Sequence, residues 1–206
     1  MVAQVTSSNF RRVRKDRVEI LGVFGAGKTT LAHRLAENQR LVLAENYERN
    51  IFWNDQQAIN ALGYLPCDLS FLLQHAHLVA RAAVTGSECL FCDWSLLSDR
   101  LWASMRLGQE FAAYETVHRA VSDRIGQPLG YLYLKQPAEV IAARLVKRGR
   151  SAESAFSAQA APRAADQLEA LVRSLPPERV LTVGEDVPLK YVRTWTARRR
   201  ESAGLA

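Results

Sequence analysis

The sequence predicts an α/β fold, built as a five-stranded parallel sheet flanked by helices. Short apolar segments alternate along the chain with longer segments in which apolar residues follow helical spacing. That alternation is typical of parallel sheets, because two parallel strands are usually joined by a helical crossover. Glycine and carboxylate residues follow several of the apolar segments, and ligands bind such sheets at the carboxyl ends of the strands. The length of 206 residues fits one domain of this class.

The strands are expected where apolar runs end in turn residues or carboxylates. They lie at 18–24, 40–46, 88–94, 130–134 and 179–183. Helices are expected between them, because Leu31 and Leu35 are four residues apart, and Leu69, Leu72 and Val79 share one helical face. The expected helices cover 30–37, 65–84, 96–107, 110–125, 137–147 and 156–174, with a last one after Pro188.

A glycine-rich loop, LGVFGAGKTT at 21–30, ends the first strand and begins the first helix. Gly22, Gly27, Lys28 and Thr29 match the phosphate-loop pattern G-x-x-x-x-G-K-[ST]. In such a loop the backbone N–H groups surround phosphates, the lysine reaches the β- and γ-phosphates, and the hydroxyl binds Mg²⁺. The sequence therefore predicts a P-loop fold that binds ATP, or another nucleoside triphosphate, together with Mg²⁺. The expected contacts are Gly22, Gly25, Ala26, Gly27, Lys28, Thr29 and Thr30.

Two carboxylates at predicted strand ends are candidates for the chemistry. Asp93 follows the third strand, where it can hold Mg²⁺ directly or through water, or be an ordinary surface aspartate. Glu45 ends the second strand and can accept a proton from a substrate hydroxyl. The alternatives for Glu45 are a solvated loop residue, with Glu48 as the competing base.

A cationic cluster, RLVKRGR at 144–150, follows the fourth strand. Arg144 and Arg148 are four residues apart on one helical face. Arginines that close over phosphates neutralise developing charge and exclude water. We therefore expect an arginine-rich lid at about 148–160, and we expect Arg144, Arg148 and Arg150 to contact phosphates. The alternative is a solvated basic helix end, which the helix dipole favours.

Composition limits the other classes of function. No apolar run approaches the roughly 20 residues of a membrane span, and the N-terminus lacks an apolar signal core. We therefore expect a cytoplasmic protein with reduced cysteines and no membrane partner. The net charge is +6, but the excess lies near both ends, so we interpret 1–17 and 197–206 as basic tails around one domain at 18–196. Nucleic-acid binding through these tails is an alternative that predicts strong salt dependence.

Four segments together resemble the deoxynucleoside kinase family, especially its bacterial deoxyadenosine and deoxyguanosine kinase-like members. They are GVFGAGKTT at 22–30, ENYERNIF at 45–52, DWSLLSDR at 93–100 and RLVKRGRSAE at 144–153. The resemblance spans about residues 18–185 and implies a P-loop kinase with an arginine lid, acting as a homodimer. It also implies Glu45 as the general base, with Arg144, Arg148, Arg150 and Glu153 contacting phosphate and sugar.

The residue after Asp93 departs from the family pattern. Trp94 stands where the family usually has an arginine that steadies the reacting hydroxyl and the transferring phosphate. An arginine at such a position can be worth about 10³ to 10⁵ in rate. Another cation, Arg49 or Arg100, would then have to compensate.

The positions that contact the nucleoside in the family are also altered. Asp68 and His75 stand at two base-reading positions and share one helical face, while Asp99 matches a base-reading aspartate. Gln57 lies near the position of a sugar-contacting tyrosine. Two alternatives stay open: Asp68 as a helix cap and His75 as a structural histidine.

The sequence favours a kinase that transfers the γ-phosphate of ATP, or another nucleoside triphosphate, to a hydroxyl of a nucleoside or nucleoside-like metabolite. One alternative is a kinase of a non-nucleoside alcohol, which the altered acceptor positions motivate. A second is a nucleotide-binding regulator without transfer activity, which Trp94 motivates. The expected partners are the small-molecule substrate and a second copy of the chain.

Overall fold

The structure is a computed structural model that describes residues 16–36, 41–83, 88–148 and 151–205. Its centre is a five-stranded sheet with the strand order β2-β3-β1-β4-β5. The strands are β1 (Arg17–Leu21), β2 (Val42–Leu43), β3 (Leu90–Cys92), β4 (Gly130–Leu134) and β5 (Val180–Val183). All neighbouring strands pair in parallel, which confirms the predicted sheet.

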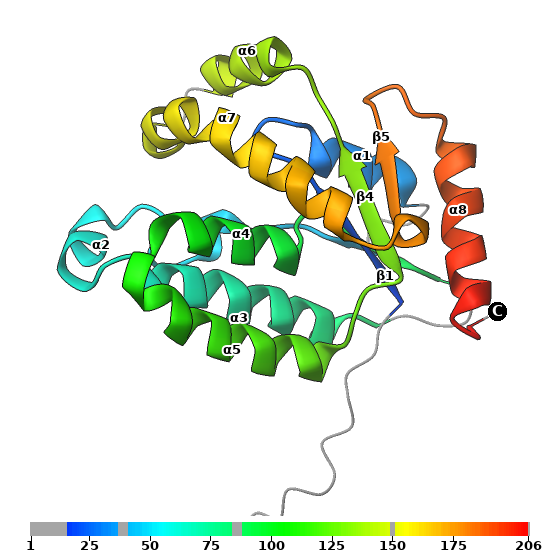
Figure 1. Cartoon of the computed structure of the whole chain (residues 1–206), viewed down its shortest axis with the longest axis horizontal. Coiled ribbons are helices and arrows are strands. Elements are labelled where there is room, and N and C mark those ends of the chain that lie inside the picture. Colours follow the sequence, from blue (N-terminus) through cyan, green and yellow to red (C-terminus); the bar gives the residue numbers. More distant parts are fainter. Residues whose placement is uncertain (1–15, 37–40, 84–87, 149–150, 206) are drawn as a thin grey trace, which may run out of the picture.

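Helices cover both faces of the sheet (Figure 1). They are α1 (Lys28–Leu35), α2 (Gln56–Leu62), α3 (Leu65–Arg81), α4 (Leu96–Arg106), α5 (Phe111–Ile125), α6 (Ala138–Arg148), α7 (Ser151–Ser174) and α8 (Leu189–Ser202). Helices α1 and α8 contact each other on one face, while α3, α4 and α5 pack together on the other with α7 against α4. Across the described ranges, no helix has both the length and the apolarity needed to cross a bilayer.

The core lies between the sheet and these two helical layers. Val18, Ile20, Leu90 and Leu132 on the central strands have no exposed surface. Strands of a parallel sheet are covered on both faces, which is why their sequences are continuous apolar runs rather than alternating ones. The three cysteines are buried and free, as the sequence led us to expect.

The region expected to form a lid is more regular than the sequence suggested. Helix α7 begins at Ser151, so 151–160 is helical although its small side chains gave little periodic signal. Helix α2 was not expected at all, because its short sequence has no apolar stripe. Asp55 nevertheless caps it by accepting a hydrogen bond from the Ala58 N–H at 2.9 Å.

The expected C-terminal tail at 197–206 is wrong as far as residue 202, because α8 continues to Ser202. Arg200 is 8% exposed, and its Nη1 pairs with Asp16 Oδ2 at 2.8 Å. A run of basic residues on a helix can extend away from the fold or pack against it. Here the ion pair with Asp16 shows that the end of α8 packs against the start of β1. The N-terminal tail 1–17 also ends earlier than expected, since β1 begins at Arg17; residues 1–15 lie outside the described part.

An ion pair lies inside the sheet at the start of β1. The Arg17 Nε donates to Glu19 Oε1 at 2.9 Å, and both side chains are 1% exposed. The guanidinium also donates to the carbonyls of Ile125 and Gly126, at 3.2 and 2.7 Å. Glu19 Oε2 accepts from the hydroxyl of Ser95 at 2.9 Å. The pair therefore connects β1 with the N-terminus of α4, two residues after Asp93.

Candidate active site

The glycine-rich loop joins β1 to α1 with the geometry that a phosphate loop requires. Gly25 and Gly27 have φ values of 81° and 99°, in the left-handed region that residues with side chains rarely adopt. Lys28 is the first residue of α1, and its Nζ donates to the carbonyls of Gly22 at 3.0 Å and Val23 at 3.2 Å. The loop thus lies at the N-terminus of a helix, where backbone N–H groups and the helix dipole favour an anion.

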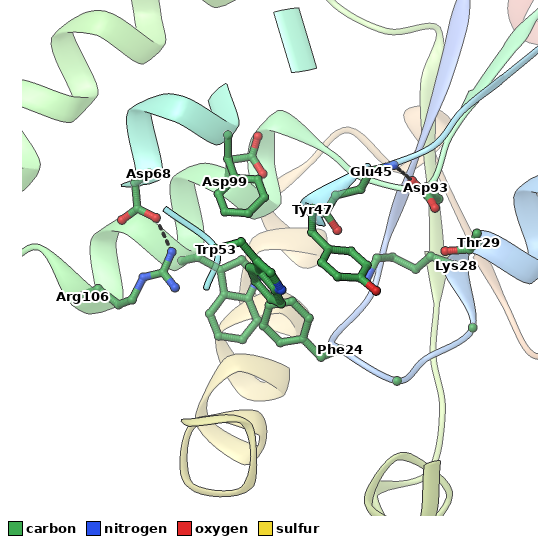
Figure 2. A pocket seen from close by; sticks show the side chains of 14 residues that line it. Phe24, Lys28, Thr29, Glu45, Tyr47, Trp53, Asp68, Asp93, Asp99 and Arg106 are labelled. Carbon is green, nitrogen blue, oxygen red and sulfur yellow. Dashed lines mark hydrogen bonds and ion pairs between the residues drawn. The ribbon is translucent and has the colours of Figure 1, made fainter. Parts of the chain in front are cut away.

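A pocket opens beside this loop at the carboxyl ends of β1, β2 and β3 (Figure 2). Figure 2 shows Lys28 and Thr29 near one end of the pocket, and Asp68 with Arg106 at the other. Residues from distant parts of the chain therefore share one cavity. The sequence-predicted residues that line it are Gly25, Gly27, Lys28, Thr29, Glu45, Asp68, Asp93 and Asp99.

Two carboxylates lie close together near the loop end of the pocket. Asp93 directly follows β3 and is 3% exposed, and its Oδ1 accepts the backbone N–H of Glu45 at 2.6 Å. This contact fixes the turn after β2 against the end of β3. The side chain of Glu45 is 29% exposed and lines the pocket. Glu48 is exposed and accepts from the Tyr47 hydroxyl at 3.2 Å, so Glu45 is the better placed of the two glutamates.

The environment of Glu45 disfavours its charged form. Burial raises the pKa of the Glu45 carboxyl above its ordinary value. The positive charges of His75 and Lys28 oppose this rise, while the carboxylates of Asp99 and Asp93 add to it. A carboxyl group with a raised pKa is a stronger proton acceptor, provided that it is ionised at the working pH.

Asp68 lies at the far end of the pocket from the loop. Its side chain is 4% exposed; Oδ1 pairs with Arg106, and Oδ2 is buried with no hydrogen-bond partner among the described residues. Burial raises the pKa of Asp68, and Arg106 opposes this shift. The N-cap of α3 is Tyr64 and the cap makes no side-chain hydrogen bond, so the helix-cap interpretation of Asp68 is wrong.

Three residues expected to contact substrate do not line this pocket. His75 has no exposed surface, and Trp94 is 2% exposed. Their rings stack with centroids 4.1 Å apart and planes 2° apart. His75 shares a face of α3 with Asp68, but two helical turns place it about 10.5 Å further along the helix axis, in the core. Gln57 is exposed on α2 and lines a separate, open hollow.

Arg144 lies against the glycine-rich loop but does not line the pocket itself. Its Nη1 donates to the carbonyl of Ala26 at 3.1 Å, and its Nη2 donates to both carboxylate oxygens of Glu185 at 2.6 Å. With Ala26 and Thr30 it lines a second hollow beside the loop. The side chains of Arg148 and Glu153, and the whole of Arg150, lie outside what the structure describes.

The aromatic walls of the pocket were missed by the sequence analysis. The ring of Phe24 stacks on Trp102 with centroids 4.7 Å apart, and Tyr47 packs on Trp53 at 4.9 Å. All four line the pocket, as do Phe71 and Arg106. Flat aromatic faces stack well on planar bases. Phe24 and Tyr47 lie inside two of the segments quoted above, at positions that the phosphate-loop pattern leaves open or that were not considered. Trp53 lies eight residues after Glu45, where a search for aromatic residues would have found it.

The fold and the loop define a P-loop nucleotide-binding protein, with the glycine-rich loop and two carboxylates at adjoining strand ends of a parallel sheet. The chain belongs to the deoxynucleoside kinase family, whose sequence model matches residues 18–170. It is therefore a nucleoside kinase of the class that uses ATP.

Solved structures of this family have the same fold. One is described as deoxyadenosine kinase from M. mycoides with dATP bound; it is 17% identical, with a TM-score of 0.67, and the match covers 91% of this chain and 99% of that one. Another is the same kinase with the products dCMP and a flexible dCDP; it is 16% identical, with a TM-score of 0.63, covering 91% and 98%. No curated protein sequence matches the chain.

Proposed function

We propose that this kinase transfers the γ-phosphate of ATP to a hydroxyl of a nucleoside whose base presents N–H donors, with Glu45 as the general base. The observation that carries this proposal is the pocket itself. It places Glu45 between the phosphate loop at one end and the buried carboxylate of Asp68 at the other. A nucleoside has the matching order, with a hydroxyl at one end and a base at the other.

The donor is held by the glycine-rich loop in this proposal. The loop backbone binds the phosphates, and Lys28 leaves the carbonyls of Gly22 and Val23 to contact the β- and γ-phosphates. Arg144 is already fixed against the loop by Glu185, close to where phosphate charge would lie. We assign Arg148 and Arg150 to the same role, from the sequence alone.

Thr29 and Asp93 are the residues that we assign to Mg²⁺. Both line the pocket next to Lys28, and a hydroxyl and a carboxylate are the hard oxygen ligands that this ion prefers. Magnesium in kinases typically keeps few protein ligands and binds the substrate phosphates. When bound, the ion neutralises charge on the β- and γ-phosphates.

The transfer step needs little covalent chemistry from the protein. The nucleoside hydroxyl attacks the γ-phosphorus, its proton passes to Glu45, and the bond from that phosphorus to the β–γ bridging oxygen breaks to release ADP. Lys28 and Arg144 stabilise the charge that develops on the transferring group. Phe24, Tyr47 and Trp53 exclude water and hold the planar base.

Asp68 selects the base in this proposal. Its carboxylate lines the far end of the pocket, where Arg106 holds it. An amino or imino N–H of a nucleobase would make a charge-assisted hydrogen bond to this carboxylate. Asp99 lines the same pocket and offers a further carboxylate on that side.

Replacing Asp68 with asparagine should lower kcat/KM for the preferred nucleoside by about 10- to 100-fold, the effect of losing one charge-assisted hydrogen bond. The KM for ATP should not change, because Asp68 lies at the far end of the pocket from the loop. Steady-state kinetics with each substrate varied would measure both values. Asp123→Asn, an exposed aspartate on α5, is the matched control. An equal loss for ATP and nucleoside would contradict the assignment.

The direct test of the function is release of ADP in a coupled assay with Mg-ATP and a panel of ribo- and deoxyribonucleosides. We expect turnover that depends on the nucleoside, stops when EDTA removes Mg²⁺, and is lost in Lys28→Ala. The amino-bearing bases should be the better acceptors. Absence of nucleoside-dependent ADP release from wild-type protein that still binds ATP would reject the proposal in favour of a non-nucleoside acceptor.

The homodimer that the family resemblance implies is also part of the proposal. Leu73 on α3 is 54% exposed, which supports a contact surface on the outer side of this helix. We expect light scattering after size exclusion to give twice the chain mass, and Leu73→Glu to shift the protein toward monomer. A monomer at micromolar concentration would contradict this expectation.

A further inference from the structure

Arg49 and Arg100, the two arginines considered from the sequence as replacements for the family arginine after Asp93, do not reach the pocket. Arg100 points away from the pocket, with its Nε donating to Glu115 Oε2 at 2.7 Å. It lines a different hollow, near the start of β1. Arg49 is exposed and does not line the pocket.

His75 approaches Glu45 from the core, on the buried side of the pocket. Its Nε2 lies 3.8 Å from Glu45 Oε1, and its Nδ1 lies 2.7 Å from Asp99 Oδ2. Nε2 is buried and makes no hydrogen bond within the described residues. A short inward movement of the Glu45 carboxylate would bring the two atoms into hydrogen-bond range.

The surroundings of His75 favour its charged form. Burial alone would lower its pKa, but the carboxylates of Asp99, Glu45 and Asp93 outweigh that effect and raise the pKa above the ordinary histidine value. Only the imidazolium has an N–H on both ring nitrogens, and so can donate to both Asp99 and Glu45. The neutral ring has a single N–H and can donate to only one of them.

Packing fixes the orientation of the His75 ring. The indole of Trp94 lies flat against it, with ring planes 2° apart. Phe71, one turn earlier on α3, lies with its ring centroid 6.2 Å from the imidazole. The bond to Asp99 then sets the rotation of the ring, so that Nε2 is directed at Glu45.

We propose that His75 is a positioning residue for Glu45: held by Asp99 and Trp94, it places Nε2 beside the general base and orients the Glu45 carboxylate toward the substrate hydroxyl. This inference rests on the proposed role of Glu45. In this proposal Trp94 supports the His75 ring by stacking on it and does not contact the substrate. Because Asp99 contacts His75, Asp68 is left as the main hydrogen-bond acceptor for the nucleobase.

Two substitutions separate the bonds that His75 makes. In His75→Gln the amide can take the place of Nε2 and still donate toward Glu45. In His75→Asn the amide can take the place of Nδ1, which keeps the contact with Asp99 but no longer reaches Glu45. We expect kcat to fall by about 10²-fold in His75→Asn, the scale of a misplaced catalytic group. The loss should be smaller in His75→Gln, and the KM for ATP should not change in either.

A double-mutant cycle with Glu45→Gln tests whether His75 acts through Glu45. If it does, His75→Asn causes no further loss of kcat in the Glu45→Gln background, because the group that it orients is already absent. His118→Asn is the matched control: it removes another buried histidine, whose Nε2 contacts the carbonyl of Leu96, the first residue of α4, at 3.0 Å. It should leave kcat unchanged at equal folded fraction.

Three results would overturn the inference. They are an equal fold loss from His75→Asn in both backgrounds, a loss confined to the KM for the nucleoside, and unchanged kcat in folded His75→Asn. If thermal unfolding shows that His75→Asn does not fold, the same cycle is run with His75→Phe, which can keep the stacking on Trp94 but has no N–H to donate to Glu45. A wild-type protein without nucleoside-dependent ADP release would instead reject the proposed function itself, so the two failures are distinguishable.

Discussion

Replacing Glu45 with glutamine is expected to lower kcat by about 10²- to 10⁴-fold, the usual contribution of a general base. Glutamine keeps the shape of the side chain but does not accept the hydroxyl proton at neutral pH. The hydrogen bond between the Glu45 backbone N–H and Asp93 Oδ1 does not involve the side chain, so the turn after β2 should be preserved. Rates at saturating ATP and nucleoside would measure the loss, and calorimetry should find ATP affinity unchanged.

Glu48→Gln is the matched control for this experiment. It changes a glutamate three residues away that is exposed and does not line the pocket, so kcat should stay at the wild-type level. Near wild-type turnover in Glu45→Gln would remove Glu45 from the role of general base. A collapse of activity in Glu48→Gln instead would transfer the role to Glu48.

The pH dependence of the wild-type enzyme should report the same group. Burial raises the pKa of Glu45, and the carboxyl accepts a proton only when ionised. Activity is therefore fully present above this raised pKa and is lost as the pH falls through it. The acidic limb of the kcat profile should lie at a higher pH than an ordinary glutamate would give. It should disappear from the residual activity of Glu45→Gln.

The sheet and the phosphate loop were predictable because their signals are local in the sequence. An apolar run followed by glycines, lysine and threonine specifies a strand, a turn and a helix start without reference to the rest of the chain. The strand-end positions of Glu45 and Asp93 followed from the same pattern, and both line the pocket. Helix α2 has no such pattern; in the structure it packs on α3 and its N-terminus is capped by Asp55.

The acceptor end of the site was less predictable, because its contacts join distant helices. Arg106 ends α4 and pairs with Asp68 at the start of α3, which no spacing in the sequence indicates. Similarly, the stacking of Trp94 on His75 places both residues beneath the pocket, although the family resemblance put them in contact with substrate. Helical periodicity gives the face on which a residue lies, but not its depth in the fold.

The depth of a residue in the fold was also not predictable at the start of β1. The segment 1–17 was expected to be a basic tail, but its last residue, Arg17, is buried in the core. The buried guanidinium of Arg17 loses its hydration, but it donates hydrogen bonds to Glu19 and to the carbonyls of Ile125 and Gly126. Removing one member of a buried pair leaves the other charge without compensation. Arg17→Met should therefore destabilise the protein by about 3–5 kcal/mol, measured as the free energy of unfolding in urea.

A loss of this size is a large part of the roughly 5–15 kcal/mol by which domains are stable. The double variant Arg17→Met, Glu19→Gln separates charge from packing. It removes both charges, while the glutamine can still accept the backbone N–H of Leu96, which Glu19 Oε2 accepts at 3.2 Å. We expect it to recover most of the lost stability, because the uncompensated charge is the main cost. If Arg17→Met alone costs less than about 1 kcal/mol, the value typical of an exposed pair, the expected cost of an uncompensated buried charge is contradicted.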